Sequence, residues 1–543
     1  MLMWICLSWM VFAMVAGAQP AITTNGIVNA ASAVPVGLPN SSIAQGSMFS
    51  IYGTNMGPAS SPPLSSWPLQ KTLGGVTIQI QDASGATLQA IPLYVSPGQI
   101  NAILPSATAV GTATATATYG GQTSAPASFT VVKSSFGILA QDQAGSGPGV
   151  VSNYVQNAAW PMNTIVSSAQ PGQPVVLWGT GLGPVTGDET TPPVQGDLRS
   201  GLDPMTLWVG GQQVNIDYAG RSTSAGQDQI NFVAPNITGC WVPVTLQIGS
   251  MASNTITISI SPFGGACQDP SMTNLNLATV QANGLKEGTV TLEQVTTHLL
   301  ASGGGFGGGS YLDSTEQTAL AHFVMYDGPH LMTLRGQGIS TYGACTEIGF
   351  LQASAPDVNP DAGLDAGGAL TVAGPDGASN SMLPPIASSV GDYAGILNPL
   401  TAGTYNIGNG TGGKDVGPFT ASLTLPAPIA WTNMNAVTQI DRLAGLTVNW
   451  TGGSGDVIIS GTAQELGPSG PVATFTCLAR AEDGTFTVPS YVLMALPAAA
   501  TGVGMAATLT VANQAATTNF TANGLDVGTF SALFVTQESV NFF

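Results

Sequence analysis

Apolar and polar residues alternate with a period of two over most of the first 270 residues, and Gly, Pro, Asn and Ser interrupt the alternation every several residues. Such alternation predicts short antiparallel strands, because successive side chains of a strand point to opposite faces of its sheet. The clearest case is residues 111–132, which read GTATATATYGGQTSAPASFTVV. Helical periodicity is nearly absent in this part of the chain. The pattern therefore favours β-sandwiches.

The same pattern occurs twice. Residues 46–58 read GSMFSIYGTNMGP, and residues 172–184 read GQPVVLWGTGLGP. Further on, SPGQINAILP at 96–105 matches AGQDQINFVAP at 225–235, and each copy then closes with alternating strands. This internal repeat predicts two tandem sandwiches of somewhat over a hundred residues each.

Glycines recur at the end of the repeated phrase. They are Gly53 and Gly57 in the first copy, and Gly179, Gly181 and Gly183 in the second. A glycine-rich turn after an apolar strand could bind a phosphate, but such a turn has to open a helix within a βαβ unit. The sequence after the second copy is VTGDETTPPVQGD, which cannot form an amphipathic helix. We therefore interpret the five glycines as structural turn residues.

The order of these motifs resembles the IPT/TIG immunoglobulin-like domains. Together with GIVNAAS at residues 26–32, both GT-x-x-GP turns and both QIN segments resemble a tandem region of secreted proteins of soil bacteria, over residues 24–262. The resemblance implies an immunoglobulin-like fold and an extracellular setting, and it implies no catalytic residues. The second half of the chain is only weakly similar to segments that accompany that region.

The expected fold class is all-β, with tandem immunoglobulin-like β-sandwiches followed by a further β-sandwich or jelly-roll-like C-terminal region. The expected division is a signal peptide at 1–18, repeats at 19–134 and 135–270, and a β-rich region of one or two domains at 271–543. Within that region, residues 284–300 could form a strand or a short helix, and GGGFGGGS at 303–310 has the composition of a linker.

The first eighteen residues are uncharged and apolar, and they end in Ala16-Gly17-Ala18, a small-x-small cleavage pattern. A membrane anchor is the alternative, although the run is short for one. No later segment of the sequence contains a run of about 18 apolar residues. We therefore expect an exported protein with no integral membrane segment after cleavage.

In an exported protein, the four cysteines that follow the expected signal peptide are expected to form disulfides. We pair Cys240 with Cys267, because they lie at opposite ends of two expected neighbouring strands, and this leaves Cys345 with Cys477. The chain has no Cys-x-x-Cys motif, so a zinc site is not expected.

Charge excludes some partners. Nine basic and 28 acidic residues give a net charge of −19, which repels nucleic acid and disfavours an anionic membrane surface. Only 7% of the residues are charged, whereas 44% are hydrophobic, so the chain should fold.

One segment has oxygen ligands at the spacing of a calcium loop. The candidate ligands are Asp357, Asn359, Asp361 and Asp365, within DVNPDAGLDAGG. An EF-hand needs Gly at its sixth position and Glu at its twelfth, where this chain has Ala362 and Gly368. Turn-forming Asp and Asn residues in a loop explain the same segment, so calcium remains an alternative and no other cofactor is expected.

Other candidate chemistry has a structural explanation. The three histidines, His298, His322 and His330, form no metal-binding motif, and no GxSxG motif is present. The acidic pairs Asp188-Glu189 and Glu482-Asp483 could be glycosidase carboxylates, or residues of surface turns. Exposed tryptophans would suit carbohydrate, but Tyr52 and Trp178 occupy matched positions on apolar strands and are predicted to be core. The final Phe543 is expected to end a packed last strand.

The sequence thus favours a non-enzymatic secreted or cell-surface interaction protein that contacts polysaccharide, matrix or another protein. One alternative is an exported polysaccharide-active enzyme with catalytic carboxylates in residues 271–543 and the repeats as accessory modules. The other alternative is a structural spacer. A cleft with two convergent carboxylates would favour the enzyme, and several exposed aromatic rings on a flat sheet would favour the binding protein.

Overall fold

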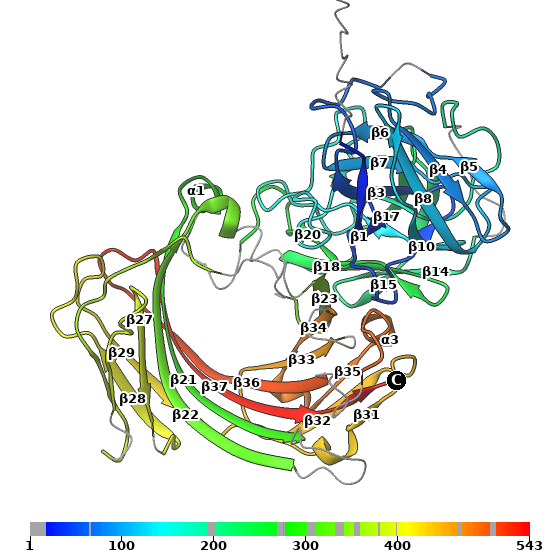
Figure 1. Cartoon of the computed structure of the whole chain (residues 1–543). Coiled ribbons are helices and arrows are strands. Elements are labelled where there is room, and N and C mark those ends of the chain that lie inside the picture. The colour runs from blue at the N-terminus through cyan, green and yellow to red at the C-terminus, as the bar shows by residue number, and fades with distance from the viewer. Residues whose placement is uncertain are drawn as a thin grey trace, which may run out of the picture.

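The structure is a computed structural model that describes residues 18–64, 67–193, 202–268, 275, 277–300, 311–331, 341–351, 359–377, 381–397, 399–464, 470–499 and 507–543. Strands dominate, and the described helices, such as α1 (Leu277–Asn283) and α3 (Ser490–Leu493), are short. The protein is all-β and built from several sheets (Figure 1). Residues 1–17 of the expected signal peptide, the glycine-rich stretch at 303–310 and Asp357 lie outside the described residues.

The first repeat consists of two sheets with a core between them. One sheet has, in order, β1 (Ala21–Asn29), β3 (Met48–Thr54), β7 (Gln99–Ile103) and β6 (Ile91–Val95). The other has β2 (Ile43–Ala44), β10 (Ala127–Val132), β8 (Gly111–Tyr119), β4 (Thr77–Gln81) and β5 (Thr87–Gln89), with β9 (Gln122–Thr123) beside β8. Along β8 the alanines are buried in this core, which accounts for the Thr-Ala alternation of its sequence.

The second repeat has the same plan. Its first sheet has β13 (Pro174–Thr180), β17 (Asp228–Val233) and β16 (Ile216–Arg221), with both β11 (Gly137–Ile138) and β12 (Val151–Asn153) paired to β13. Its second sheet has β15 (Gln212–Val214), β14 (Met205–Val209), β18 (Gly239–Ile248) and β19 (Met251–Ala252), with β20 (Ile256–Ile260) also beside β18. Side chains from both sheets form a second core.

Strand register shows that the two copies are equivalent in detail. Ile51 of β3 lies opposite Ile100 of β7, and Leu177 of β13 lies opposite Ile230 of β17. All four side chains are completely buried. The main difference is that the single strand β1 of the first copy corresponds to the two short strands β11 and β12 of the second.

The repeats meet at the second glycine-rich phrase. Oδ2 of Asp228 accepts hydrogen bonds from the backbone N–H groups of Gly181 and Leu182, both at 2.9 Å. Arg221 forms an ion pair with Asp228 (Nη1 to Oδ1, 3.1 Å) and donates from Nη2 to the carbonyl oxygen of Gly46 in the first repeat (2.8 Å). Both charged side chains are buried. The turn therefore binds an anion, but that anion is a carboxylate of the same chain.

Two of the five glycines predicted as turn residues need the left-handed backbone region. The φ angles of Gly181 and Gly183 are 107° and 130°. In the first copy Asn55 occupies the position of Gly181 with a φ of 56°. Asn is one of the few side chains that tolerate this region. Gly57 lies outside it, and a Cβ atom there would be 3.1 Å from the carbonyl oxygen of Ser96.

Gly53 and Gly179 have a different role from the one predicted. They lie inside β3 and β13, and not in the turns that follow. A Cβ atom on Gly53 would collide with the carbonyl oxygen of Ala21, and one on Gly179 with that of Gly137. These glycines allow the neighbouring strand to approach closely.

The C-terminal region contains one nine-stranded sheet. It has β23 (Ala344–Leu351), β34 (Pro471–Arg480), β33 (Asp456–Gln464), β36 (Ala507–Phe520), β37 (Val527–Ser539), β21 (Leu285–Leu300), β22 (Tyr311–Tyr326) and β24 (Ala362–Gly363), with β27 (Asp392–Ile396) also beside β22. Residues 285–300, within the stretch that could have been strand or helix, are thus a strand. The longest strands curve strongly (Figure 1).

Smaller sheets pack on this large sheet and enclose two separate cores. One core involves β26 (Ser381–Leu383), β25 (Leu370–Ala373), β28 (Gly403–Gly408) and β29 (Thr420–Leu425). The other involves β30 (Ala430–Trp431), β32 (Leu446–Thr451), β35 (Thr485–Val488), β31 (Gln439–Ile440) and β38 (Asn541–Phe542). Phe542 is buried there. Phe543 is 61% exposed, so the expectation that it ends a packed last strand is wrong.

Both cores use the same long strand. β36 contributes Leu509 and Val511 to one core and Phe520 to the other. A register shift between Gln514 and Ala516 changes the phase of the alternation, so all three apolar side chains face the same side of the sheet. The sequence left open whether this half holds one unit or two, and the structure has two cores that share one sheet.

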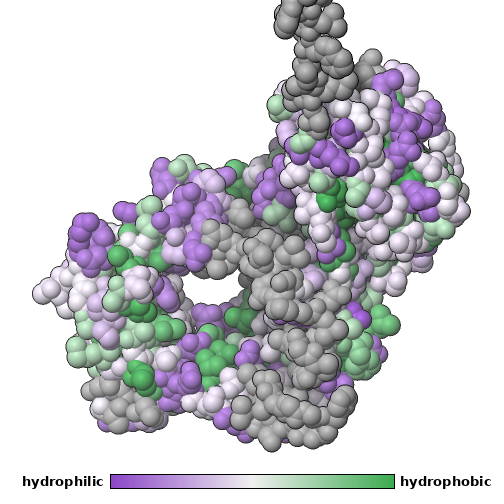
Figure 2. All heavy atoms as spheres, viewed as in Figure 1, coloured by the Kyte–Doolittle hydropathy of each residue, from purple (hydrophilic) through white to green (hydrophobic). Residues whose placement is uncertain are grey.

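The described C-terminal region contacts both repeats. The ring of Trp208 from β14 stacks on that of Tyr491 from α3, with centroids 4.7 Å apart. Trp241 of the second repeat shares a small core with Leu277 and Val280 of α1. Leu38 of the first repeat belongs to the core of the C-terminal region that includes Cys345. An opening is visible between the curved sheet and the repeats in both views (Figures 1 and 2).

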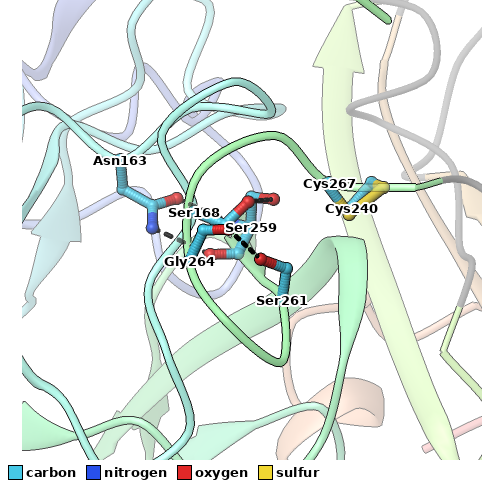
Figure 3. Close-up of a disulfide and its surroundings, with 7 residues drawn as sticks. All are labelled: Asn163, Ser168, Cys240, Ser259, Ser261, Gly264 and Cys267. Carbon is cyan, nitrogen blue, oxygen red and sulfur yellow. Dashed lines mark hydrogen bonds between the residues drawn. A yellow bond between two sulfur atoms is a disulfide. The ribbon is translucent and has the colours of Figure 1, made fainter. Parts of the chain in front are cut away.

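The structure contains the disulfides Cys240–Cys267 and Cys345–Cys477. The first lies where the chain leaves the second repeat (Figure 3). Beside it, Asn163 accepts a hydrogen bond from the backbone N–H of Ser259 (2.7 Å) and donates to the carbonyl oxygen of the same residue (2.9 Å). The segment in which the chain leaves the second repeat is therefore held by a disulfide and by buried hydrogen bonds.

The disulfide Cys345–Cys477 closes a loop of 132 residues between the neighbouring strands β23 and β34. Replacing both cysteines with Ala is expected to lower the free energy of unfolding by about 2–4 kcal/mol, because the longer the closed loop, the more the bond restricts the unfolded chain. Denaturant titration of the C-terminal transition measures this loss. The matched control removes Cys240–Cys267, which closes only 27 residues and should matter less; an equal or greater loss from the control would contradict the prediction.

Candidate functional site

The two QIN segments form the same hydrogen bond on the same face of their sheets. In β7, Nε2 of Gln99 donates to Oδ1 of Asn101 at 2.8 Å. In β17, Nε2 of Gln229 donates to Oδ1 of Asn231 at 2.7 Å. Because the intervening isoleucine of each segment is in the core, both carboxamides lie on the outward face. Each pair leaves Gln Oε1 and Asn Nδ2 as groups that a ligand hydroxyl can meet.

Aromatic residues flank both amide pairs at equivalent register positions. In the first repeat, Tyr52 lies opposite Gln99, and Tyr94 lies opposite Asn101. Both tyrosines are 41% exposed. The face thus combines two rings with an oriented amide pair.

In the second repeat, Trp178 lies opposite Gln229, and Tyr218 lies opposite Asn231. Both rings are partly exposed. The indole Nε1 of Trp178 donates to Oγ of Ser152 at 3.5 Å, a long hydrogen bond that places the ring across the neighbouring strand. The second face therefore repeats the composition of the first.

The prediction that Tyr52 and Trp178 are core residues is wrong. Their strands are apolar, but the alternation places Ile51 and Leu177 inward and their C-terminal neighbours outward. Tyr52 and Trp178 belong to no buried core of the described residues. An apolar strand does not by itself reveal which of its aromatic residues is exposed.

An irregularity of the strand places the second ring in each copy. In β6 the register shifts between Pro92 and Tyr94, and in β16 it shifts between Ile216 and Tyr218. A bulge inserts one residue and turns the next side chain to the other face. Without the shift, each tyrosine would point into the core. A register shift at the equivalent place therefore orients Tyr94 in the first copy and Tyr218 in the second.

The face of the second repeat has a shallow hollow. A pocket of about 170 Å³ is lined by Tyr218, Arg221, Ser222, Thr223, Gln229 and Asn231. A second pocket, of about 360 Å³, lies at the junction of the repeats, and Arg221 lines both. Since the charge of Arg221 is balanced by buried Asp228, the hollow presents polar groups with little net charge.

Of the residues proposed for calcium, the structure describes Asn359, Asp361 and Asp365, and the two aspartates accept hydrogen bonds from nearby groups. Oδ2 of Asp361 accepts hydrogen bonds from the backbone N–H of Asp327 (2.7 Å) and from Nδ1 of His330 (3.1 Å), which hold the pKa of this carboxyl group below its usual value. Asp365 accepts from the N–H of Gly367 at 2.8 Å. Asn359 is exposed. Across the described part of the chain, no three His, Cys, Asp or Glu side chains are grouped to hold a metal ion.

Each histidine is hydrogen-bonded through its ring to the carboxylate of an aspartate. His298 contacts Asp313, His322 contacts Asp392 at 2.7 Å, and His330 contacts Asp361. The three pairs lie at different positions along β21, β22 and the segment after β22, so the structure does not bring the histidines together.

Three of the four carboxylates proposed for a glycosidase, Asp188, Glu189 and Asp483, accept hydrogen bonds from nearby groups, and Glu482 is exposed. Asp188 accepts hydrogen bonds from the N–H and hydroxyl groups of Thr190, which lower its pKa. Glu189 accepts from the N–H and hydroxyl groups of Ser106 in the first repeat. Asp483 accepts from the N–H of Arg480. These carboxylates stabilise turns and the junction of the repeats.

One carboxylate that sequence patterns did not indicate is fully buried. Glu347 of β23 lies opposite Phe475 and is 5% exposed. Burial raises its pKa to about 8. It lies on the face of the sheet that carries Cys345, within the core that also includes Leu38 of the first repeat. A raised carboxyl pKa can mark a general acid, but the side chain of Glu347 is 5% exposed and packs among core residues.

None of the described helices has the length and apolar character needed to cross a bilayer. The sequence matches no model of a protein family and no curated protein.

Several solved structures align over most of the chain at low similarity. A tetra-tandem repeat from the extending region of a large adhesion protein shows 12% identity, covers 96% of this chain and 98% of that chain, and has a TM-score of 0.13. An S-layer protein shows 12% identity, 95% and 54% coverage, and a TM-score of 0.17, so this chain spans about half its length. A protein of the Bacteroides ovatus mixed-linkage glucan utilisation locus, in complex with a mixed-linkage heptasaccharide, shows 12% identity, 95% and 97% coverage, and a TM-score of 0.12. Scores this low carry no argument about function.

Proposed function

We propose that this chain is a non-enzymatic protein of the cell exterior that binds polysaccharide through the outward faces of its two repeats. The observation that carries the proposal is the duplicated arrangement of two aromatic rings around a Gln–Asn hydrogen bond. Rings and carboxamides at fixed spacing suit the apolar faces and the hydroxyl groups of sugars. In this proposal residues 1–18 are a signal peptide, and residues 19–134 and 135–270 are IPT/TIG-like domains.

Other features support this setting. Two disulfides suit an oxidising compartment. Three candidate carboxylates of the described C-terminal region, Asp361, Asp365 and Asp483, accept hydrogen bonds from their surroundings, and Glu347 lies in the core. This favours a binding protein over the alternative of an enzyme with catalytic carboxylates in residues 271–543. The large C-terminal sheet then holds and presents the repeats.

The proposal is tested with the full chain and a panel of insoluble and soluble polysaccharides. The double variant Tyr52→Ala, Trp178→Ala is expected to weaken binding by about tenfold or more, because aromatic residues at the centre of an interface carry much of its binding energy. Pull-down and affinity electrophoresis measure the effect, and release of reducing ends from the same panel tests for hydrolysis.

The control is Phe263→Ala, because Phe263 is 89% exposed, lies in the loop closed by Cys240–Cys267 and is not on a strand of either face. It should bind like the unmodified protein. The proposal fails if no polymer of the panel binds, or if the double variant and the control bind equally well.

A further inference from the structure

The face of the second repeat is longer than that of the first. Beyond β12, Tyr154 follows Ser152 by two residues and so lies on the same side of the strand. Its ring contacts that of Trp160, with centroids 5.2 Å apart, and the two side chains are 37% and 43% exposed. Met162, which is 42% exposed, forms a bridge with Ser152 at the edge of the same sheet. In the first repeat, the position equivalent to Tyr154 is Ala30, because its N–H donates to the carbonyl oxygen of Met48 as that of Tyr154 donates to the carbonyl oxygen of Pro174, and it carries no ring.

These residues lie on the same outward face as the rings and the amide pair of the second repeat. Going across the sheet, the outward positions are Tyr154 and Ser152 on β12, Val176 and Trp178 on β13, Gln229 and Asn231 on β17, and Tyr218 on β16, and of these Ser152 and Val176 are buried. The indole of Trp178 is hydrogen-bonded to Ser152 and thus bridges β12 and β13. Four strands about 4.8 Å apart make a track of about 15 Å, enough for several linked sugar rings. The hollow beside Tyr218 ends the track.

The charge of this face limits what it can bind. The outward positions of β12, β13, β17 and β16 are uncharged, and Arg221 and Asp228 are buried and neutralise each other. Asp217, at the bulge of β16, is exposed and acidic, and the whole chain carries a net charge of −19. Among the described residues of these four strands the one cation is Arg221, and Asp228 balances its charge, so a polymer of uronic acids would meet repulsion. An uncharged glycan would meet no such repulsion at this face.

Resting on the proposed function, we infer that the second repeat is the principal site and that its ligand is a linear, uncharged glycan lying across β12, β13, β17 and β16. The shorter face of the first repeat is a secondary contact. The rings at Trp160, Trp178 and Tyr218 stack on successive sugar faces, and the Gln229–Asn231 pair meets hydroxyl groups between them.

The test measures the affinity of the full chain for neutral polymers and for uronic-acid polymers at low and high salt. Trp160→Ala is expected to weaken binding of neutral polymer by about tenfold, whereas Tyr52→Ala in the first repeat should change it by less than about threefold. Uronic-acid polymers should bind at least about tenfold more weakly at low salt, with the gap narrowing as salt screens the repulsion. Thermal melting confirms that each variant is folded.

The outcomes separate this inference from the proposed function. If neutral polymer binds but Tyr52→Ala weakens it as much as Trp160→Ala, the ranking of the two repeats is wrong while the proposed function stands. If uronic-acid polymers bind as tightly as neutral ones at low salt, the ligand class is wrong. If no polymer binds, the proposed function fails and this inference fails with it.

Discussion

Replacing Asp228 with Ala is expected to lower the free energy of unfolding of the repeats by about 3–5 kcal/mol, the range for breaking a buried ion pair from one side. Asp228 is 1% exposed, and its carboxylate balances the charge of Arg221, which is 6% exposed. The same carboxylate accepts the N–H groups of Gly181 and Leu182. The variant therefore leaves a buried cation without its counter-ion and two backbone donors without their acceptor.

Denaturant titration of the full chain measures the loss in the transition of the repeats. The control is Asp203→Ala, because Asp203 also pairs with a cation, Lys133, at 2.9 Å, but on the surface. Exposed ion pairs contribute about 0–1 kcal/mol. Asp228→Asn keeps an oxygen acceptor, so its loss of unfolding free energy should lie between those of Asp228→Ala and Asp203→Ala. Similar losses for Asp228→Ala and Asp203→Ala would show that the buried pair does not hold the junction.

The second large effect concerns pH. Glu347 has a pKa of about 8 in the folded protein, against 4.5 as its ordinary value. The folded state therefore binds the proton more tightly, so the contribution of Glu347 is most favourable below pH 4.5 and is lost as the pH rises toward 8. Between pH 4.5 and pH 7 this loss amounts to about 3 kcal/mol. Glu347→Gln, which cannot ionise, should remove this part of the pH dependence.

The measurement is the stability of the C-terminal transition at several pH values between 4.5 and 8. Glu347→Gln should be more stable than the unmodified protein at pH 8 and similar to it near pH 4.5. Glu316→Gln serves as the control, because it makes the same substitution at an exposed position, on β22. Parallel profiles for Glu347→Gln and the unmodified protein would show that Glu347 does not ionise in the core.

Local patterns were enough to predict much of the fold. Alternation in GTATATAT identifies β8, and the repeated QIN segments fall on β7 and β17. These features depend on residues close together in the chain, so a single sequence reveals them. The expected domain boundaries at 134/135 and 270/271 stay predictions.

The rest depends on contacts between distant residues. The parallel pairing of β21 with β37 joins residues 240 positions apart, for example Glu287 and Val527, and nothing in either strand specifies its partner. The exposure of Tyr52 and Trp178 depends on which side of an apolar strand the core lies. The bulges that place Tyr94 and Tyr218 are likewise invisible in the sequence. The candidate face could therefore be located by its repeated amides, but its rings could not.

The shared sheet also determines the order in which the chain can fold. Each repeat closes its core with residues from one continuous segment of little more than a hundred residues, so it can fold as soon as that segment has been made. In the C-terminal region, β37 lies between β21 and β36 and is almost the last strand to be synthesised. Until residue 539 is available, β21 and β36 present open edges that can pair with other chains. A chain that crosses a membrane before folding postpones this hazard until the missing strand has arrived.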